Sequence, residues 1–202
     1  MKIICIGRNY AEHAQELGNE VPESPVIFMK PDTAVLKKGS DFYIPEFSDD
    51  VHYELEVVLK ISKGGKYIQD ENADKYYDEI GLGIDFTARD LQSKLKEKGL
   101  PWELAKGFDG SAVLSEFYKK ENFNMKNLNF SLRKNKEEVQ NGTTSMMIFS
   151  PEKIIAFVSQ YFTLRVGDLI FTGTPKGVGK VSENDMLQAF LEDEKVFDLR
   201  IQ

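Results

Sequence analysis

The chain has 202 residues, of which 41% are hydrophobic and 29% are charged, and its formal net charge is −7. This length suits one globular domain over residues 1–202 with a full hydrophobic core. The acidic balance argues against a nucleic-acid partner. No segment is long and apolar enough for a signal peptide or a membrane span, and the single cysteine, Cys5, excludes an intrachain disulfide, so we expect a cytoplasmic protein.

Short apolar runs dominate the first half of the chain. We predict strands at residues 2–7, 26–30, 41–45 (weaker), about 53–61 and 81–86. We predict helices at residues 10–17, with Asn9 as the N-cap, at 72–78, and at 88–98, capped by Asp85 or Thr87. The basic cluster at residues 94–98 on the last of these helices is typical of a solvated helix face.

The second half is mostly strand-forming. Residues 128–134 and 137–141 predict a hairpin that turns at Asn135-Lys136. Ser150 and Pro151 are typical of the start of a helix, here extending to Tyr161. A strand is expected at 169–173 and two more between 185 and 201. Many short strands with few helices indicate an α+β, β-rich fold.

The strand near residue 55 carries two carboxylates. Glu54 and Glu56 are two residues apart and therefore point the same way, while Tyr53, Leu55 and Val57 fill the opposite face. Two buried like charges need a partner, and a divalent cation with oxygen ligands supplies one. Taken alone, Glu54 and Glu56 fit an exposed edge strand better than a metal site. Asp85 ends another apolar run that is typical of a buried strand, and this third carboxylate favours the metal site.

Other candidates lie on the first predicted helix, on the helix that follows Asp85 and in the segment around Lys106. His13 and Glu16 share a helix face, where they could activate water or form an inconsequential surface pair. Lys106 lies in an apolar segment. It could be a desolvated lysine that stabilises an enolate, or a snorkelling surface lysine, whose aliphatic stem covers apolar groups while its ammonium reaches water. Arg89 and Gln92 share a face and could reach a metal-held ligand.

Two further features have less chemical weight. His52 lies on the glutamate side of its strand, but three carboxylates favour a hard ion over zinc, so we expect a role behind the ligands or in packing. The glycine-rich segment 172–179 lacks both the P-loop and the dinucleotide pattern. It is better interpreted as a rigid turn whose amides and threonine hydroxyls meet a carboxylate ligand.

These segments, in this order, resemble the fumarylacetoacetate hydrolase family, short single-domain branch. The resemblance rests on the following stretches: 7–10 with His13 and Glu16, 28–31, 53–56, 85–90, 100–102 with 105–106, and 172–175. It implies a mixed β-sandwich roll, usually a homodimer, that binds Mg²⁺ or Mn²⁺, with Ca²⁺ as an alternative. It assigns the metal to Glu54, Glu56 and Asp85, water activation to His13 and Glu16, and charge stabilisation to Lys106. Substrate contacts would come from Arg8, Lys30, Arg89, Gln92 and Thr174.

The expected activity is metal-dependent cleavage of a C–C bond in a small 2-oxo acid. Acylpyruvate hydrolysis to pyruvate and a carboxylic acid would use water activated by His13 and Glu16, whereas oxaloacetate decarboxylation passes through the same enolate without water. One alternative is an isomerase or hydratase of 2-oxo-enoic acids in aromatic catabolism. The other is a non-catalytic metal- or ligand-binding module, against which the presence of both His13 and Glu16 argues.

Overall fold

The largest element of the fold is a mixed seven-stranded sheet. The computed structural model describes residues 1–16, 18 and 20–202. The sheet has the order β2-β1-β11-β4-β5-β7, with β8 also paired to β5. Only β1 and β11 are parallel among these pairs, with Ile3 opposite Leu169. Its strands are β1 (Ile3–Gly7), β2 (Val26–Lys30), β4 (Leu55–Ile61), β5 (Tyr77–Asp85), β7 (Ala112–Leu114), β8 (Tyr118–Lys119) and β11 (Leu169–Phe171).

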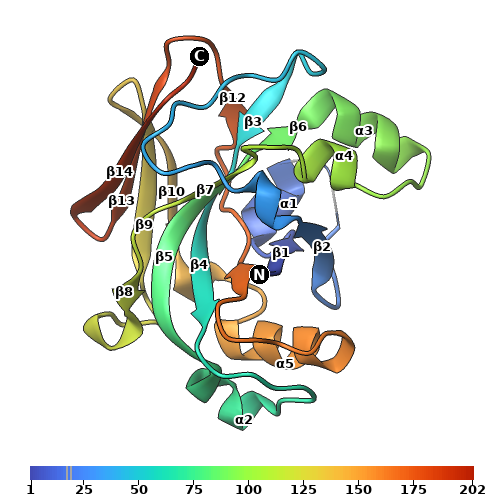
Figure 1. The fold of residues 1–202 in the computed structure, drawn as a ribbon, viewed down its shortest axis with the longest axis vertical. Coiled ribbons are helices and arrows are strands. Elements are labelled where there is room, and N and C mark those ends of the chain that lie inside the picture. Colours follow the sequence, from blue (N-terminus) through green and yellow to red (C-terminus); the bar gives the residue numbers. More distant parts are fainter. Residues whose placement is uncertain (17, 19) are drawn as a thin grey trace.

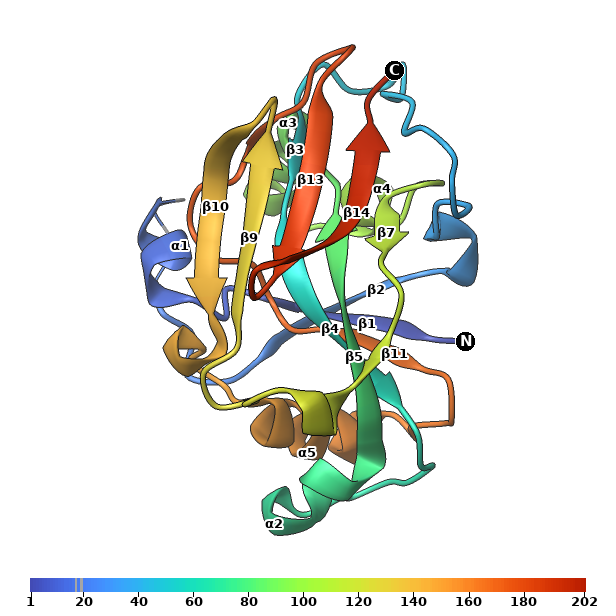
Figure 2. The same ribbon diagram turned by 90° about the vertical axis from the view of Figure 1, so that its left-hand side faces the viewer.

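A second sheet packs across the first, and the main core lies between them. Its strands, in the order β10-β9-β13-β14, are β9 (Asn129–Lys134), β10 (Glu137–Thr143), β13 (Met186–Leu191) and β14 (Glu194–Arg200). Figure 2 shows these strands in front of β4 and β5. Leu55, Val57 and Leu82 of the first sheet share one apolar cluster with Leu132 and Leu187 of the second. The structure is therefore α+β and strand-rich, as predicted.

In the residues that the structure describes, a three-stranded sheet and five short helices complete the fold (Figure 1). The small sheet consists of β12 (Gly179–Lys180), β3 (Val51–Tyr53) and β6 (Thr87–Ala88). The helices are α1 (Ala11–Glu16), α2 (Asp70–Ala73), α3 (Arg89–Glu97), α4 (Glu103–Lys106) and α5 (Pro151–Tyr161), with 3₁₀ turns at Asp32–Ala34, Asp74–Tyr76, Lys120–Asn122 and Thr144–Met146. Within the described part of the chain, no helix is long and apolar enough to cross a membrane.

The predicted turn at Asn135-Lys136 and the predicted start of the helix at Ser150 and Pro151 are confirmed. Asn135 and Lys136 both have positive φ, 53° and 75°, which is the primed-turn geometry that joins β9 and β10. The Ser150 side chain accepts a hydrogen bond from the Lys153 amide, and Pro151 occupies the first turn of α5. Backbone geometry at these positions is therefore set locally.

Several predicted boundaries are wrong. The helix expected at 72–78 ends early, because Tyr77 is buried in the core as the first residue of β5. The expected strand at 41–45 is reduced to one bridge between Phe42 and Ile201. Ala88 occupies the N-cap position of α3 without any side-chain cap, so Asp85 and Thr87 do not cap it. The first helix ends at Glu16, and Leu17 lies outside the described residues.

Candidate metal and active site

Three carboxylates meet where β4 and β5 run side by side. Glu54 lies at the break between β3 and β4, Glu56 lies on β4, and Asp85 ends β5. The Asp85 amide donates to the Glu54 carbonyl at 2.8 Å, which fixes the two strand ends together. One oxygen from each carboxylate lies within 4.8 Å of the others, and all three side chains are buried. The alternation of side chains around β4 therefore places Glu54 and Glu56 away from the apolar cluster that holds Leu55 and Val57, as predicted.

The charges in this triad are only partly compensated. Burial, together with the charges of Asp85 and Glu54, raises the pKa of Glu56 well above its usual range. The Glu56 carboxylate accepts the Gly173 amide at 2.6 Å, and no ion pair to it is found among the described residues. Burial alone would raise the pKa of Glu54, but Lys106 and Arg89 hold it well below its usual range. Three buried oxygen donors with an uncompensated charge fit a hard divalent cation.

Lys106 lies among these acids rather than in apolar surroundings. Its Nζ donates to Glu54 Oε2 at 2.8 Å, to Asp85 Oδ2 at 2.7 Å and to Thr87 Oγ1 at 2.6 Å. Burial would lower the pKa of Lys106, but Asp85 and Glu54 outweigh it and raise the pKa. The snorkelling alternative is therefore wrong, because the ammonium is completely enclosed at the site. The Phe28 ring centroid, 4.9 Å from Nζ, covers one side of it.

Lys30 lies behind the acids and does not line the cavity. Its Nζ is 2.7 Å from Asp85 Oδ1, and both side chains are fully buried. It also donates to the Ser111 hydroxyl at 3.0 Å and to the backbone carbonyl of Lys106. The geometry therefore does not support the expectation that Lys30 contacts substrate. Lys30 instead holds the carboxylate of Asp85 in place.

The predicted dyad forms beside the triad. His13 Nδ1 lies 3.3 Å from Glu16 Oε2, and both Glu16 oxygens accept the Gly177 amide, at 3.1 and 3.2 Å. The carboxylate can only accept, so Nδ1 carries the proton and Nε2 is left free. Burial lowers the pKa of His13, although Glu54 and Glu16 oppose the shift, which favours a neutral imidazole.

The glycine-rich segment binds protein carboxylates rather than a ligand. Gly173 and Gly177 both have positive φ, and their amides are directed at Glu56 and Glu16. A Cβ at Gly173 would lie 2.7 Å from Asn9 Cβ, so only glycine fits there. The prediction of a rigid turn is correct, but the acids that its amides hold belong to the chain. Thr174 of this segment does face the cavity.

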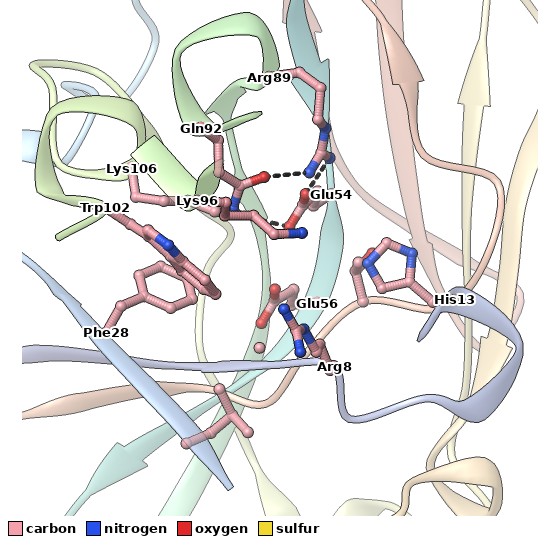
Figure 3. Close-up of a pocket in the computed structure, with 13 residues that line it drawn as sticks. Arg8, His13, Phe28, Glu54, Glu56, Arg89, Gln92, Lys96, Trp102 and Lys106 are labelled. Atoms are coloured by element: carbon pink, nitrogen blue, oxygen red, sulfur yellow. Dashed lines mark hydrogen bonds and ion pairs between the residues drawn. The ribbon is translucent and has the colours of Figure 1, made fainter. Parts of the chain in front are cut away.

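A cavity opens beside Glu54 and Glu56 (Figure 3). It contains about 430 Å³ of space, including its opening to solvent. Arg89 bonds to the carboxylate of Glu54 and donates to Gln92 Oε1 at 2.7 Å. The walls of the cavity are formed by the side chains or backbone of Ile6, Gly7, Arg8, His13, Phe28, Glu54, Glu56, Arg89, Gln92, Lys96, Trp102, Lys106 and Thr174.

Sequence reasoning missed three of the lining side chains. Phe28 and Trp102 pack with ring centroids 5.9 Å apart and form one wall, and Lys96 extends from α3 at the rim. The spacing of Arg89, Gln92 and Lys96, three and then four residues apart, is the signal that could have identified Lys96. His52 is not in the triad; its Nε2 lies 2.9 Å from Asp50 Oδ1.

The chain is similar to known proteins over most of its length. A model of the family described as fumarylacetoacetate (FAA) hydrolase C-terminal matches residues 2–202. The chain is 45% identical to a Bos taurus protein named oxaloacetate tautomerase FAHD1, mitochondrial, over 93% of this chain and 85% of that one. It is 41% identical to Escherichia coli oxaloacetate tautomerase YcgM, over 92% of this chain and 86% of that one.

A solved structure extends the likeness to three dimensions. The fumarylpyruvate hydrolase of Pseudomonas aeruginosa, in complex with Mn²⁺ and pyruvate, superposes with a TM-score of 0.94 at 35% identity. The match covers 100% of this chain and 89% of the other.

Proposed function

Because the chain belongs to the fumarylacetoacetate hydrolase family, we propose that it is a divalent-metal-dependent enzyme that interconverts the keto and enol forms of oxaloacetate. The observation that carries the proposal is the buried acidic triad, of which Glu54 and Glu56 line a cavity together with cationic side chains. Relatives from cattle and Escherichia coli that are named oxaloacetate tautomerases support this choice of reaction.

Glu54, Glu56 and Asp85 would hold Mg²⁺ or Mn²⁺. Bound there, the ion would act as a Lewis acid that polarises the 2-oxo group of the substrate. The Mn²⁺ and pyruvate complex of the Pseudomonas relative supports a metal and a 2-oxo acid in this position.

The protein's own groups would move and hold the proton. His13 Nε2 takes a proton from C3 of the oxo acid, and Glu16 orients the ring and stabilises its charge through Nδ1. The three N–H groups of Lys106 are taken by Glu54, Asp85 and Thr87, so its ammonium would stabilise, by its positive charge, the negative charge that develops on the 2-oxo oxygen of the substrate. Returning the proton to that oxygen gives the enol, and the same steps in reverse give the keto form.

A second candidate reaction is hydrolysis of an acylpyruvate, which the sequence predicts alongside oxaloacetate decarboxylation. It is supported by the His13–Glu16 dyad at the cavity wall, since the same base could activate water. The fumarylpyruvate hydrolase similarity supports it as well. Decarboxylation of oxaloacetate would need only the enolate-stabilising groups.

The test separates the three reactions on one preparation. Protein stripped with EDTA and reloaded with Mg²⁺ or Mn²⁺ is mixed with enol oxaloacetate, and the decay of its ultraviolet absorbance is followed beside CO₂ release. Acetylpyruvate cleavage is measured in parallel. We expect metal-dependent ketonisation faster than that of Glu56→Gln protein with the same metal. Ketonisation no faster than in that control would overturn the proposal.

A further inference from the structure

A buried glutamine of the second sheet reaches the glycine-rich segment beside the triad. Gln140 lies on β10 and is 1% exposed. Its Oε1 accepts the amide of Leu55, the first residue of β4, at 2.9 Å. Its Nε2 donates to the Thr174 hydroxyl at 2.8 Å and to the Pro175 carbonyl at 3.0 Å. One carboxamide thus connects β4, which carries Glu56, to a threonine that lines the cavity.

A β-bulge in β10 turns Gln140 toward the site. In a regular strand Glu138 and Gln140 would point the same way, because the side-chain period is two. The pairing with β9 shifts between them, so that Glu138 lies opposite the exposed Arg133 and Gln140 lies opposite the buried Leu132. Bulges of this kind redirect a side chain. The charged residue therefore stays in water, and the glutamine enters the interior.

The same bulge packs directly against the glycine-rich segment. A Cβ added at Gly177 would collide with the carbonyl oxygen of Val139, the residue between Glu138 and Gln140. The two backbones therefore approach so closely that only glycine fits at residue 177. Together with the hydrogen bonds of Gln140, this contact fixes the segment against the second sheet, so the position of Thr174 depends on β10.

The chemistry of the partners determines the direction of each hydrogen bond. The Leu55 amide can only donate and the Pro175 carbonyl can only accept, so the carboxamide of Gln140 has one possible orientation. Its nitrogen can only donate, so the Thr174 oxygen is the acceptor in their contact. The proton of the Thr174 hydroxyl then needs another acceptor, and none is found among the residues that the structure describes. Because Thr174 lines the cavity, an oxygen of a bound ligand is the acceptor that fits.

We propose that Gln140 is a positioning residue of the active site, which orients the Thr174 hydroxyl so that its proton meets an anionic oxygen of the bound 2-oxo acid. Without the carboxamide the hydroxyl could rotate, and the ligand would have to order it on binding. A donor that is already oriented binds an anion more tightly, because this ordering has been done in advance. The inference rests on the proposed function, since it takes a 2-oxo acid to lie at the triad. Gln140 is itself outside the cavity wall and acts through Thr174.

The chain carries its own reporter for the test. Trp102 is the single tryptophan and lines the cavity, so its fluorescence can follow pyruvate binding to Mg²⁺-loaded protein. The measurement is a double-mutant cycle of Gln140→Met and Thr174→Val, two substitutions that nearly preserve side-chain volume. A residue that acts through the Thr174 hydroxyl loses its effect once that hydroxyl is gone, whereas a residue that only supports the fold does not.

Thr174→Val should raise the dissociation constant of pyruvate at least roughly tenfold, the loss of one hydrogen bond to a charged group. Gln140→Met leaves the hydroxyl present but not oriented, and should raise the constant roughly fivefold. In protein that already carries Thr174→Val, adding Gln140→Met should change the constant by less than about twofold.

The control for general damage is Thr144→Val. Thr144 is buried just after β10, and its hydroxyl accepts the Leu128 amide and donates to the Met125 carbonyl, each at 2.9 Å, outside the cavity wall. The variant should lower Tm, as Gln140→Met should, and leave pyruvate binding as it is. Thermal unfolding of the same preparations measures the Tm.

A Gln140→Met effect of equal size with and without the Thr174 hydroxyl would overturn the inference. Unchanged pyruvate binding in Gln140→Met would also overturn it, and so would an equal loss in Thr144→Val. If Gln140→Met does not fold, Gln140→Glu takes its place in the cycle, because its carboxylate still accepts the Leu55 amide. That carboxylate would take the Thr174 proton, so adding Thr174→Val should then cost less than about twofold.

The outcome is independent of the reaction that the enzyme catalyses. If the two substitutions are coupled but no metal-dependent ketonisation is found, the positioning role stands and the proposed reaction fails. Ketonisation together with independent effects of the two substitutions gives the opposite result.

Discussion

Two buried aspartates, each paired with lysine, have different surroundings. Asp168 accepts the backbone amides of Lys2 and Arg165, each at 2.8 Å, and its ion pair with Lys2 lies at the surface end of β1. Asp85 has a lysine on each oxygen but also faces two other acids. An acid that local amides satisfy completes a turn, whereas an acid that adds to a cluster of like charges needs cations from elsewhere. The contrast separates a structural carboxylate from a proposed ligand.

The largest effect should come from Lys30→Met. The variant leaves Asp85 without its fully buried partner, and breaking such a pair costs about 3–5 kcal/mol of unfolding free energy. Urea unfolding in EDTA measures it. The matched variant, Lys2→Met, removes a lysine that is 31% exposed and should cost about 1 kcal/mol or less.

Equal losses in these two variants would contradict the comparison. If Lys30→Met fails to fold, Ser111→Ala tests the same network, because the Ser111 hydroxyl accepts from Lys30 at 3.0 Å and donates to the Lys106 carbonyl at 2.9 Å. The loss there should be about 1–3 kcal/mol, from one buried hydroxyl.

Glu56→Gln should have the next largest effect, and with opposite signs on two quantities. Removing the charge relieves repulsion from Asp85 and Glu54, so we expect the metal-free protein to gain about 1 kcal/mol, or about 2–4 °C in Tm. The same change removes a proposed ligand and should weaken Mg²⁺ binding by at least roughly 100-fold. Thermal unfolding over a Mg²⁺ titration measures both.

The control for that measurement is Glu183→Gln, because Glu183 is exposed and outside the triad. It should retain the wild-type rise of Tm with Mg²⁺. A metal-free Glu56→Gln protein that is less stable than wild type would contradict the view of Glu56 as an uncompensated charge.

The smallest effect concerns pH. Burial alone would raise the pKa of Asp168, but the hydrogen bonds from Lys2 and Arg165 lower it overall. Asp168 therefore adds stability above the ordinary carboxyl pKa, near 3.9, and loses it as pH falls through the lower folded value. Urea unfolding of wild type and Asp168→Asn should differ by about 1 kcal/mol at pH 6, with the difference shrinking toward pH 2.5. A constant difference would contradict this origin.

The sequence predicts the acids of the site well because their placement follows from local rules. Glu54 and Glu56 are placed by the period of a strand, and Asp85 by the end of an apolar run. The family resemblance, now confirmed by the match over residues 2–202, adds the order of the motifs. Neither rule depends on distant parts of the chain.

The cations are less predictable because each depends on which neighbour its flexible side chain meets. Lys30 is placed under Asp85 by the position of β2 in the sheet, and Lys106 is placed among acids contributed by two other segments. Lys96 looked like part of a solvated helix face, since only the packing of α3 near β3 and β6 shows which face adjoins the cavity. The predicted helix end at residue 78 is wrong for a similar reason, because the burial of Tyr77 in the core outweighs its local propensity.

The parallel pairing of β1 with β11 has a consequence for folding. It joins Ile3 to Leu169, and it brings the Gly173 amide onto Glu56, 117 residues away along the chain. Contacts between residues so far apart in the sequence form slowly, because the long intervening chain loses conformational entropy before the contacts offset that loss. During synthesis, Glu54, Glu56 and Asp85 are all made long before residue 173. We therefore expect the hydrogen bond from Gly173 that holds Glu56 to form late, after the pairing of β4 with β5 has brought the three proposed ligands together.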